Sequence, residues 1–356
     1  MSEQRSTVRF DQTGPKTADG RRHRLGIILP CFNHQALLAG ALGAIAGQSS
    51  PPDEVIVIDD GSSVAGRSAI AAVVARHPFV HLIRHETNRG VNAACATGLA
   101  AAASDFVLFA AADDRLIPTI VERARAALAV YPQSGILFSD NALMDASGAE
   151  KTLFPLGLDG VRCFSGPEFQ RFLKRSFFYI ATSTVWFRTE ALRRLGGFDE
   201  RLRWHSDFFA AYALGLWQGA TYVPDAASYF RVSASSYSAA RRDRREQEQV
   251  LRAWLAKTAE PAIWPQRHAF RDCGLLPVYG RQVLAALRAD PGYVTPTLVL
   301  RLLTRGLYDL VRPVLPLGWR RWLRRLSSQR GGGGEASGRG GTGPASPADP
   351  LGGPPG

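Results

Sequence analysis

Short apolar runs without polar alternation, separated by stretches of helical period, constrain the fold of this chain most strongly. Each run has the length of a strand. Four of them follow one another in the first third of the chain: LGIIL (25–29), EVIVI (54–58), FVHLI (79–83) and FVLFA (106–110). Strands without alternation are typically covered on both faces, and strict strand–helix order produces parallel neighbours. The pattern therefore predicts an α/β fold with a mostly parallel central sheet and flanking helices.

The middle of the chain is less regular, but it keeps the same elements. GILFS (135–139) and FYIATSTVWFR (178–188) read as strands or extended core, and TEALRRLGGFDE (189–200) and DFFAAYALGLWQG (207–219) read as helices. We expect this part to pack on the same sheet rather than form a separate domain.

Length and composition limit the class of protein. The chain has 356 residues and is 46% hydrophobic, which is enough for a real core. Its four cysteines are scattered without a metal-type spacing, so we expect reduced thiols and a cytoplasmic protein. The polar N-terminus lacks the apolar core of a signal peptide, and no apolar run reaches the ~18 residues of a spanning helix. These features argue against secretion and against a transmembrane anchor.

Basic charge is concentrated near the C-terminus. The net charge is +12, and residues 281–330 contain ten Arg, no Lys and two acids. On a helical wheel of residues 295–314, Arg301, Arg305 and Arg312 lie opposite Leu303, Leu307, Leu310 and Val314, and LGWRRWLRRL (317–326) repeats the pattern with Trp. Basic amphipathic helices with Trp are typical of in-plane membrane contacts, so we expect an anionic membrane surface as partner and no nucleic acid. A packing or solvated role for these helices stays open.

Two acidic pairs stand where a ligand would bind. Asp59 and Asp60 follow the second apolar run, and Asp113 and Asp114 follow the fourth. Ligands of open α/β sheets lie beyond the carboxyl ends of the strands, and four carboxylates there require a cation or hydrogen-bond donors. The alternative is that each pair caps a neighbouring helix or loop.

Five motifs occur together in a recognisable order: ILPCFN, VIVIDDGSS, NRGVNAACATGLA, AADDRLIP and GGFDERLRWHSD. In this order and spacing the chain resembles the bacterial family 2 nucleotide-sugar glycosyltransferases over roughly residues 25–235. The resemblance implies a GT-A fold and inverting transfer of one sugar from a UDP-, GDP- or dTDP-sugar to a hydroxyl acceptor. The expected organisation is a flexible tail (1–24), a GT-A domain (25–235), a helical extension (236–327) and a disordered Gly/Pro-rich tail (328–356).

The resemblance also implies a nucleotide site. Its expected members are Pro30, Phe32, Asn33, Asp59, Asp60, Arg89 and Asp113. Phe32 is suited to stacking on a base and Asp60 to accepting a base N–H, although ordinary core packing of Phe32 is the alternative. For Arg89 a plain surface position is equally open.

The family's metal motif is altered here, because Ala111 replaces its first acid. Asp113 and Asp114 remain, and the resemblance implies that they bind Mg²⁺ or Mn²⁺ together with phosphate oxygens and water. We therefore expect weak metal binding without nucleotide.

The family's general base maps onto Asp207, with Ser206 where Glu is commoner. A helix cap is the alternative for Asp207. The donor and acceptor pocket is expected to include Gly196, Gly197, Trp204, His205 and Arg231. Packing is the alternative for the two aromatic side chains, helix termination for the glycines and solvation for the arginine.

Other classes fit less well. No G-x-G-x-x-G follows the first strand, which argues against a dinucleotide enzyme. No QxxRW motif or spanning helix follows residue 230, which argues against a processive synthase. The acceptor is expected to be a surface-glycan or lipid-linked oligosaccharide precursor at the inner face of the cell membrane. A catalytically silent nucleotide-binding relative is the alternative.

Overall fold

The computed structural model describes residues 22–311, except 145–147, 155, 157, 176–177, 179, 232–242, 262 and 278–281. Most of the expected N-terminal tail, the LGWRRWLRRL helix and the expected C-terminal tail lie outside the described residues. So do Arg312, Val314 and the side chains of Arg305, Leu307 and Leu310.

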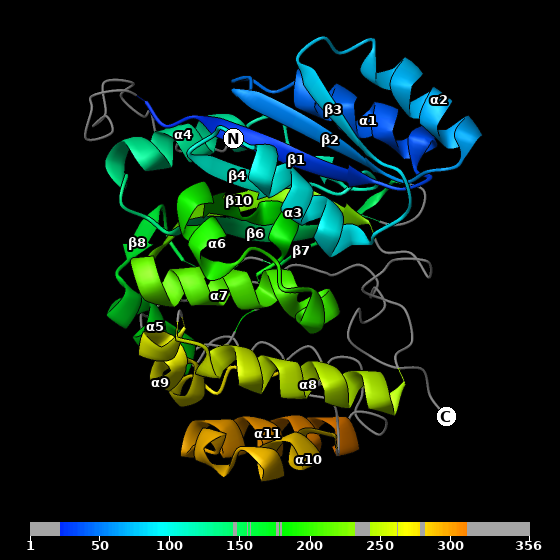
Figure 1. The fold of residues 1–356 in the computed structure, drawn as a ribbon. Helices are drawn as coiled ribbons and strands as arrows, with labels where there is room; N and C mark the ends of the chain where they lie inside the picture. Colours follow the sequence, from blue (N-terminus) through cyan, green and yellow to red (C-terminus); the bar gives the residue numbers. More distant parts are fainter. Residues whose placement is uncertain are drawn as a thin grey trace.

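A ten-stranded mixed sheet forms the centre of the molecule (Figure 1). Its main path runs β3-β2-β1-β4-β9-β6-β10-β5, with β7 paired to β6 and β8 paired to β10. The strands are β1 (Leu25–Cys31), β2 (Glu54–Asp60), β3 (Val80–His85), β4 (Phe106–Phe109), β5 (Arg115–Leu116), β6 (Ile136–Met144), β7 (Glu150–Phe154), β8 (Arg162–Phe164), β9 (Trp186–Arg188) and β10 (Ala220–Arg231). The first four are parallel to one another, as predicted, whereas β9 runs antiparallel between β4 and β6.

The apolar strands are buried because their successive side chains enter two different cores. Ile28 and Ile56 point into one core, and Leu29 and Val57 point into the other. Successive side chains of a strand face opposite sides of the sheet, so both faces need apolar residues. This is why β1 and β2 lack polar alternation. The edge strand β3 is only partly covered.

Helices cover both faces of the sheet. One face carries α1 (Gln35–Ala46), α2 (Val64–Val74) and α4 (Ile120–Val130). The other carries α3 (Val91–Ala101), α5 (Gly166–Arg175), α6 (Thr189–Leu195) and α7 (Ser206–Gln218). Two short 3-10 turns, η1 (Thr182–Thr184) and η2 (Glu200–His205), precede β9 and α7 respectively. The second half of the chain thus packs on the same sheet, as expected.

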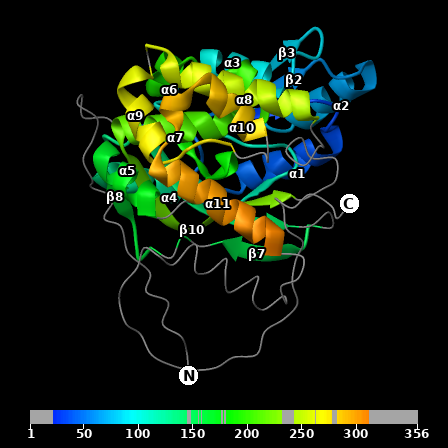
Figure 2. The ribbon, with the colours of Figure 1, turned by 90° about the horizontal axis from the view of Figure 1, so that it is seen from below.

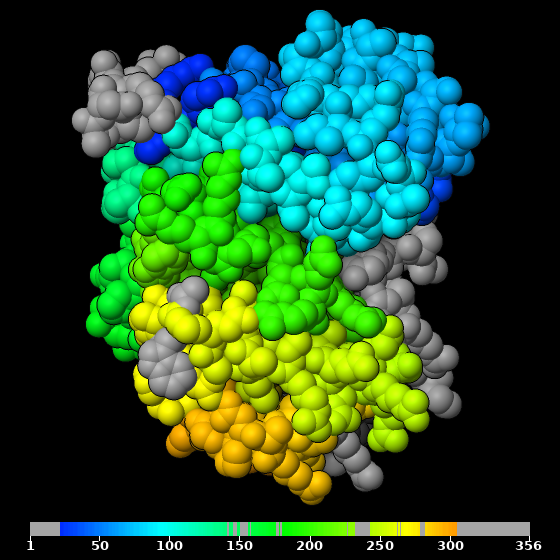
Figure 3. Space-filling model, in the orientation of Figure 1, coloured from blue at the N-terminus to red at the C-terminus, as the bar shows by residue number. Residues whose placement is uncertain are grey.

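The C-terminal helices extend the core that contains Ile28, Ile56 and the buried side of α7. They comprise α8 (Arg244–Ala259), α9 (Trp264–Asp272), α10 (Gln282–Ala289), the turn η3 (Pro291–Tyr293) and α11 (Pro296–Val311). Trp254 of α8 and Phe270 of α9 pack against Phe209 of α7. Figures 1 and 3 show these helices beneath α7, and Figure 2 shows α11 crossing the lower surface.

On α11, Leu300 and Leu303 are 60% and 65% exposed, while Arg301 turns inward and donates to the Leu173 carbonyl at 2.5 Å. The predicted opposition of Arg301 and Leu303 is therefore present. Among the described helices, none combines the length and hydropathy required to cross a bilayer.

Candidate functional site

Asn33, in the loop after β1, is hydrogen-bonded to the loop after β2. Its backbone N–H donates to Ser62 Oγ at 3.0 Å, and its Oδ1 accepts from the Ser63 N–H at 3.1 Å. Asn33 adopts a positive φ of 53°, a conformation that asparagine tolerates better than most residues. Its side chain therefore fixes the first loop of the expected nucleotide site.

Asp60 clamps the loop before α3. Its carboxylate accepts from the backbone N–H groups of Arg89 (2.9 Å) and Gly90 (2.8 Å) and contacts His85 Nδ1 at 2.7 Å. It is 3% exposed, and the far ring nitrogen of His85 lies 2.9 Å from Thr97 Oγ1. This is the loop-capping arrangement that the sequence left open. A further role of Asp60 in nucleotide binding stays a prediction.

Asp59 is fully buried beside it. One oxygen, Oδ1, accepts from the Ser62 N–H at 3.0 Å. The other, Oδ2, has no hydrogen-bond partner among the described residues, and Arg84 Nε lies 4.0 Å away. A buried carboxylate oxygen that lacks a donor is costly, so Oδ2 is suited to an N–H or O–H of a ligand.

The Asp113–Asp114 turn is tied to the end of β10. Arg231 donates from its backbone N–H to Asp114 Oδ1 (3.0 Å) and from Nε to the Asp113 carbonyl (2.9 Å). Asp114 is 7% exposed. Burial, with a smaller contribution from the Asp113 charge, raises the pKa of Asp114 to about 7. Contact between Arg231 and a diphosphate stays a prediction.

The two acids fit a cation site of the expected reduced kind. No group of three or more His, Cys, Asp or Glu that could hold a metal occurs in the described part of the chain. Two carboxylates alone suit a cation whose other ligands are phosphate oxygens and water. A bound cation would oppose the raised pKa of Asp114, since a nearby positive charge favours the ionised form.

Asp207 lies in the first turn of α7. Thr182 Oγ1 of η1 donates to its Oδ2, and the Phe208 N–H donates to its Oδ1 at 2.7 Å. Burial raises the pKa of Asp207, and the two donors oppose that shift. The pKa of Cys95 is raised mainly by burial and then by the charges of Asp207 and Asp60. Asp207 and Asp60 are therefore both close enough to Cys95 of α3 for their charges to act on its thiol.

Ser206 takes part in a network between α3 and α7. Its hydroxyl contacts Asn92 Oδ1 (3.0 Å) and the Arg203 carbonyl (2.9 Å), and Asn92 Nδ2 donates to the same carbonyl (3.0 Å). Arg203 adopts φ 48° and ψ −118°, and its guanidinium pairs with Glu246 of α8 at 2.6 Å. Strained backbone of this kind tends to occur at functional sites.

The remaining pocket candidates have structural partners. Gly196 and Gly197 end α6, with N–H groups 2.9 Å from the Arg193 and Leu192 carbonyls. His205 packs its ring against Trp204, Phe208 and Trp254. Helix termination and packing, the alternatives left open by the sequence, thus describe these residues, and pocket roles stay predictions.

Phe32 differs from its core-packing alternative, because it is 43% exposed after β1. Arg89 is also exposed, whereas Pro30 is half-buried within β1. An exposed aromatic ring at this edge of the sheet is available for stacking.

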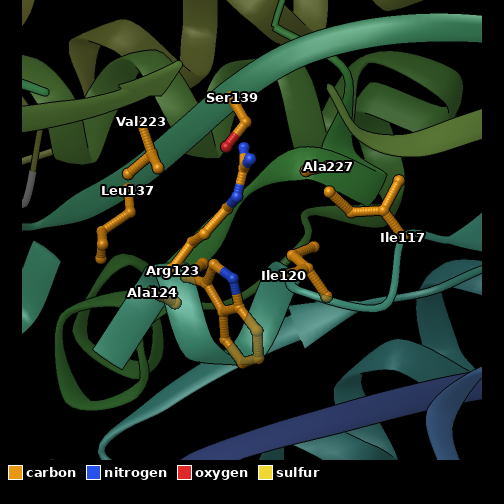
Figure 4. Close-up of a pocket in the computed structure, with 9 residues that line it drawn as sticks. Ile117, Ile120, Arg123, Ala124, Leu137, Ser139, Val223 and Ala227 are labelled. Carbon is orange, nitrogen blue, oxygen red and sulfur yellow. The ribbon is translucent and has the colours of Figure 1, made fainter. Parts of the chain in front are cut away.

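Two cavities lie away from these residues. A cavity of about 10 Å³ is enclosed between α4 and the sheet by side chains that include Arg123, Ile120 and Ala227 (Figure 4). A wider one of about 390 Å³ is lined by residues such as Asp105, Arg188 and Arg193. Neither includes a predicted site residue, so the candidate site lies outside both cavities, among the loops at the carboxyl ends of the strands.

Comparison with known proteins identifies the first part of the chain. The sequence model of glycosyl transferase family 2 matches residues 26–142. Residues 26–142 are thus similar to the family 2 glycosyl transferases. Among curated relatives, the O-antigen biosynthesis protein RfbC of Myxococcus xanthus is 25% identical over 182 residues, which cover 51% of this chain and 13% of RfbC. The matches span at most 39% of the length of the curated relatives.

Solved structures support the GT-A fold for this chain. S. aureus TarS 1-349 in complex with UDP-GlcNAc has a TM-score of 0.54 at 18% identity, with 76% of this chain and 82% of that chain covered. The mannosyltransferase PcManGT from Pyrobaculum calidifontis, in complex with GDP-Man and Mn²⁺, has a TM-score of 0.51 at 22% identity, with 90% and 88% covered. The predicted fold is confirmed.

Sequence reasoning missed the residues that hold the acids. Thr182 donates to Asp207, His85 contacts Asp60, and Asn92 accepts from Ser206. Each is an ordinary polar residue far from its partner in sequence, so no local spacing marks it. The only signal was the polar triplet TST inside the apolar run FYIATSTVWFR.

Proposed function

We propose that this protein is an inverting glycosyltransferase that moves one sugar from a nucleoside-diphosphate sugar to a hydroxyl acceptor. The observation that carries the proposal is the carboxylate of Asp207 in the first turn of α7, held by the Thr182 hydroxyl and the Phe208 N–H, in a chain whose residues 26–142 match family 2. The raised pKa of Asp207 favours proton acceptance near neutral pH.

In the proposed reaction the acceptor oxygen attacks the anomeric carbon and gives its proton to Asp207. The bond from that carbon to the diphosphate oxygen breaks, and its electron pair leaves with the nucleoside diphosphate. Attack opposite the leaving group inverts the configuration, so no covalent enzyme intermediate is needed.

The chain's own residues hold the donor. Phe32 offers its exposed ring to the base, and Asp59 offers Oδ2 to a base or ribose donor group. Asp113 and Asp114 would hold Mg²⁺ or Mn²⁺, which when bound stabilises the charge of the departing diphosphate. The GDP-Man and Mn²⁺ in PcManGT and the UDP-GlcNAc in TarS support a nucleotide-sugar donor and a divalent cation.

Calorimetric titration with UDP, GDP and dTDP, each with and without Mn²⁺, tests the donor site. We expect one nucleotide to bind only when Mn²⁺ is present. Binding of none by folded protein would reject the proposal, and binding without any turnover of donor sugars would favour the catalytically silent alternative.

The Asp207→Asn variant tests the base. We expect turnover of the sugar donor to fall by about 10²–10⁴-fold, the usual contribution of a general base, with nucleotide affinity unchanged. Glu190→Gln, on the exposed surface of α6, is the matched control for loss of one carboxylate. Full activity of Asp207→Asn would remove Asp207 from the mechanism.

We further propose that the acceptor is a surface-glycan or lipid-linked precursor at the cytoplasmic face of the membrane. The O-antigen role named for RfbC supports a surface glycan. The exposed side chains Leu284, Leu300 and Leu303, with exposed Arg288 nearby in sequence, support contact with an anionic bilayer.

Vesicle sedimentation tests the membrane contact. Full-length protein should sediment with phosphatidylglycerol vesicles, and a variant lacking residues 296–356 should not. Leu300→Asp with Leu303→Asp should weaken sedimentation in the full chain, whereas Val130→Asp, on exposed α4, should not. Unchanged sedimentation of the deletion variant would reject the anchor.

A further inference from the structure

A strained turn at Arg203 lies directly before the helix that carries the proposed base. Arg203 has φ 48° and ψ −118° within η2, a conformation that glycine adopts freely and an arginine adopts at a cost. Among the described residues, two others besides glycine have positive φ, Asn33 and Asp225, and both are of types that tolerate it. Because α7 begins at Ser206, with Asp207 in its first turn, the turn at Arg203 sets where this helix starts.

Side chains of two helices hold the backbone of this turn. Asn92 Nδ2 of α3 donates to the Arg203 carbonyl at 3.0 Å, and Ser206 Oγ lies 2.9 Å from the same oxygen. Ser206 is 3% exposed, and its Oγ also lies 3.0 Å from Asn92 Oδ1. Since Ser206 directly precedes Asp207, these contacts fix the first residue of α7 relative to α3.

The side chain of Arg203 connects the same turn to α8. Its Nη1 lies 2.6 Å from Glu246 Oε1, in the first turn of α8. The two side chains are 41% and 36% exposed, and ion pairs as open as this contribute little to stability. The arginine therefore adds a connection rather than stability, because α3, α7 and α8 all meet η2 at this residue.

Asp207 thus has two kinds of support. Thr182 Oγ1 and the Phe208 N–H donate to its carboxylate and set the direction of that group. Its backbone is placed by the turn at Arg203. A general base must lie within hydrogen-bond reach of the proton that it accepts, so a well-oriented carboxylate on a displaced backbone would not suffice.

We propose that Arg203 and Asn92 are positioning residues that place the first turn of α7, and with it Asp207, and that Glu246 makes α8 part of this support. This inference rests on the proposed function, in which Asp207 takes the acceptor proton. It deepens that function, because α8 lies outside the residues 26–142 that match family 2 and receives a role in the reaction.

The experiment separates position from stability with two full-length variants of one residue. Arg203→Gly removes both the strain and the side chain, whereas Arg203→Ala removes the side chain and keeps the strain. Three quantities are measured for each variant. They are kcat for the UDP-, GDP- or dTDP-sugar that the wild type uses, calorimetric affinity for the corresponding nucleoside diphosphate with Mn²⁺, and the urea midpoint of unfolding.

Activity should not follow stability in this pair. Arg203→Gly should unfold at a higher urea concentration than Arg203→Ala, because it lacks the strain. Both variants should nevertheless lower kcat by about tenfold or more, since misplacing a reacting group by about 1 Å can cost about 10²-fold. Nucleotide affinity should stay unchanged in both.

Variants of α8 test the part played by Glu246. Glu246→Ala should lower kcat by up to about fivefold, the factor that matches an exposed ion pair, and should add no loss to Arg203→Ala. The matched control is Glu248→Ala, which removes a carboxylate of the same helix that pairs with Arg252 at 2.8 Å. It should leave kcat unchanged.

Two further variants test whether the effect passes through Asp207. Asn92→Ala should lower kcat by about tenfold, the size expected for a buried carbonyl that loses its donor. Arg203→Gly added to Asp207→Asn should lower the residual rate no further. If Asn92→Ala does not fold, the Arg203 variants decide.

Wild-type kcat in both Arg203 variants, a kcat that follows the urea midpoint, or a parallel loss of nucleotide affinity would overturn the positioning roles and leave the proposed function intact. A wild type that neither binds a nucleoside diphosphate nor turns over a donor would show instead that the proposed function is wrong, and this inference would fall with it.

Discussion

Asp114 shows how one buried carboxyl group can link protonation, stability and ligand binding. Its pKa rises from 3.8 to about 7 mainly because burial removes water from the charged form. In the unfolded chain the same group titrates near 3.9. Between these two values the folded protein keeps a proton that the unfolded chain releases.

The sign of the resulting pH dependence follows from linkage. The stabilising contribution of protonated Asp114 is complete below pH 4 and is lost as the pH rises through 7, by about 4 kcal/mol in total. Urea unfolding of the wild type and Asp114→Asn at pH 4.5 and 7.5, values that bracket most of this window, would measure it. We expect the wild type to lose more stability than the variant, and parallel losses would contradict the raised pKa.

Cation binding should show the opposite trend. A cation that binds Asp114 must displace its proton at low pH, so Mn²⁺-dependent nucleotide binding should strengthen from about pH 6 to pH 8. Proton release, measured by calorimetry in buffers of different ionisation enthalpy, would check this. Asp114→Asn should release no proton from this group.

The acids themselves were predictable from sequence, whereas their partners were not. Asp60, Asp114 and Asp207 stand at strand ends or a helix start, positions that apolar patterns reveal. The donor Thr182 reaches Asp207 only through tertiary packing, which no local pattern encodes.

At the scale of elements, the β2–α2 connection and the loop before α3 pack without space between them. Gly61 has φ +71°, and a Cβ placed there would lie 2.2 Å from the Thr87 carbonyl carbon. Gly90 has φ +91°, but a Cβ there would meet nothing within 4 Å. An alanine at Gly90 would therefore add backbone strain alone, whereas an alanine at Gly61 would add both strain and steric overlap.

Gly61→Ala should destabilise the protein more than Gly90→Ala. Gly90→Ala is expected to cost about 1–3 kcal/mol from backbone strain alone. Gly61→Ala adds overlap with the backbone of Thr87, so it should cost several kcal/mol and disturb nucleotide binding. Urea unfolding of both variants measures the difference, and equal costs would show that the loops separate easily.

Strand and helix positions followed closely from apolar periodicity in the first half of the chain. The predicted runs at 25–29 and 54–58 lie within β1 and β2. The 12-residue strand β10 was not predicted, because Pro224, Asp225 and several alanines interrupt its apolar pattern. Irregular register with β6 accommodates that interruption.

At the scale of the whole molecule, the sheet and the C-terminal helices share one core. Leu251 and Trp254 of α8, Phe270 of α9 and Leu298 of α11 are fully buried in the same cluster as Phe187 of β9. Among the described residues, no separation of cores divides the sheet from the C-terminal helices.

Two truncated chains test whether the fold needs the helices α8–α11 and whether it needs the residues after 311. A chain ending at residue 311 should unfold cooperatively like the full protein. A chain ending at residue 235 should expose the apolar surface of α7 and be insoluble or bind a hydrophobic dye. Scanning calorimetry and dye fluorescence distinguish these outcomes, and a stable, soluble chain ending at residue 235 would contradict the shared core.

That shared core also bears on how such a protein can diversify. An appendage joined by a linker can be exchanged between proteins by recombination, because each piece folds by itself. The helices α8–α11 cannot be exchanged in this way, since each junction would require new partners for Phe209 and its neighbours. Lineages that keep this arrangement must therefore change the sheet and its helices together, by compensating substitutions on both sides of the contact.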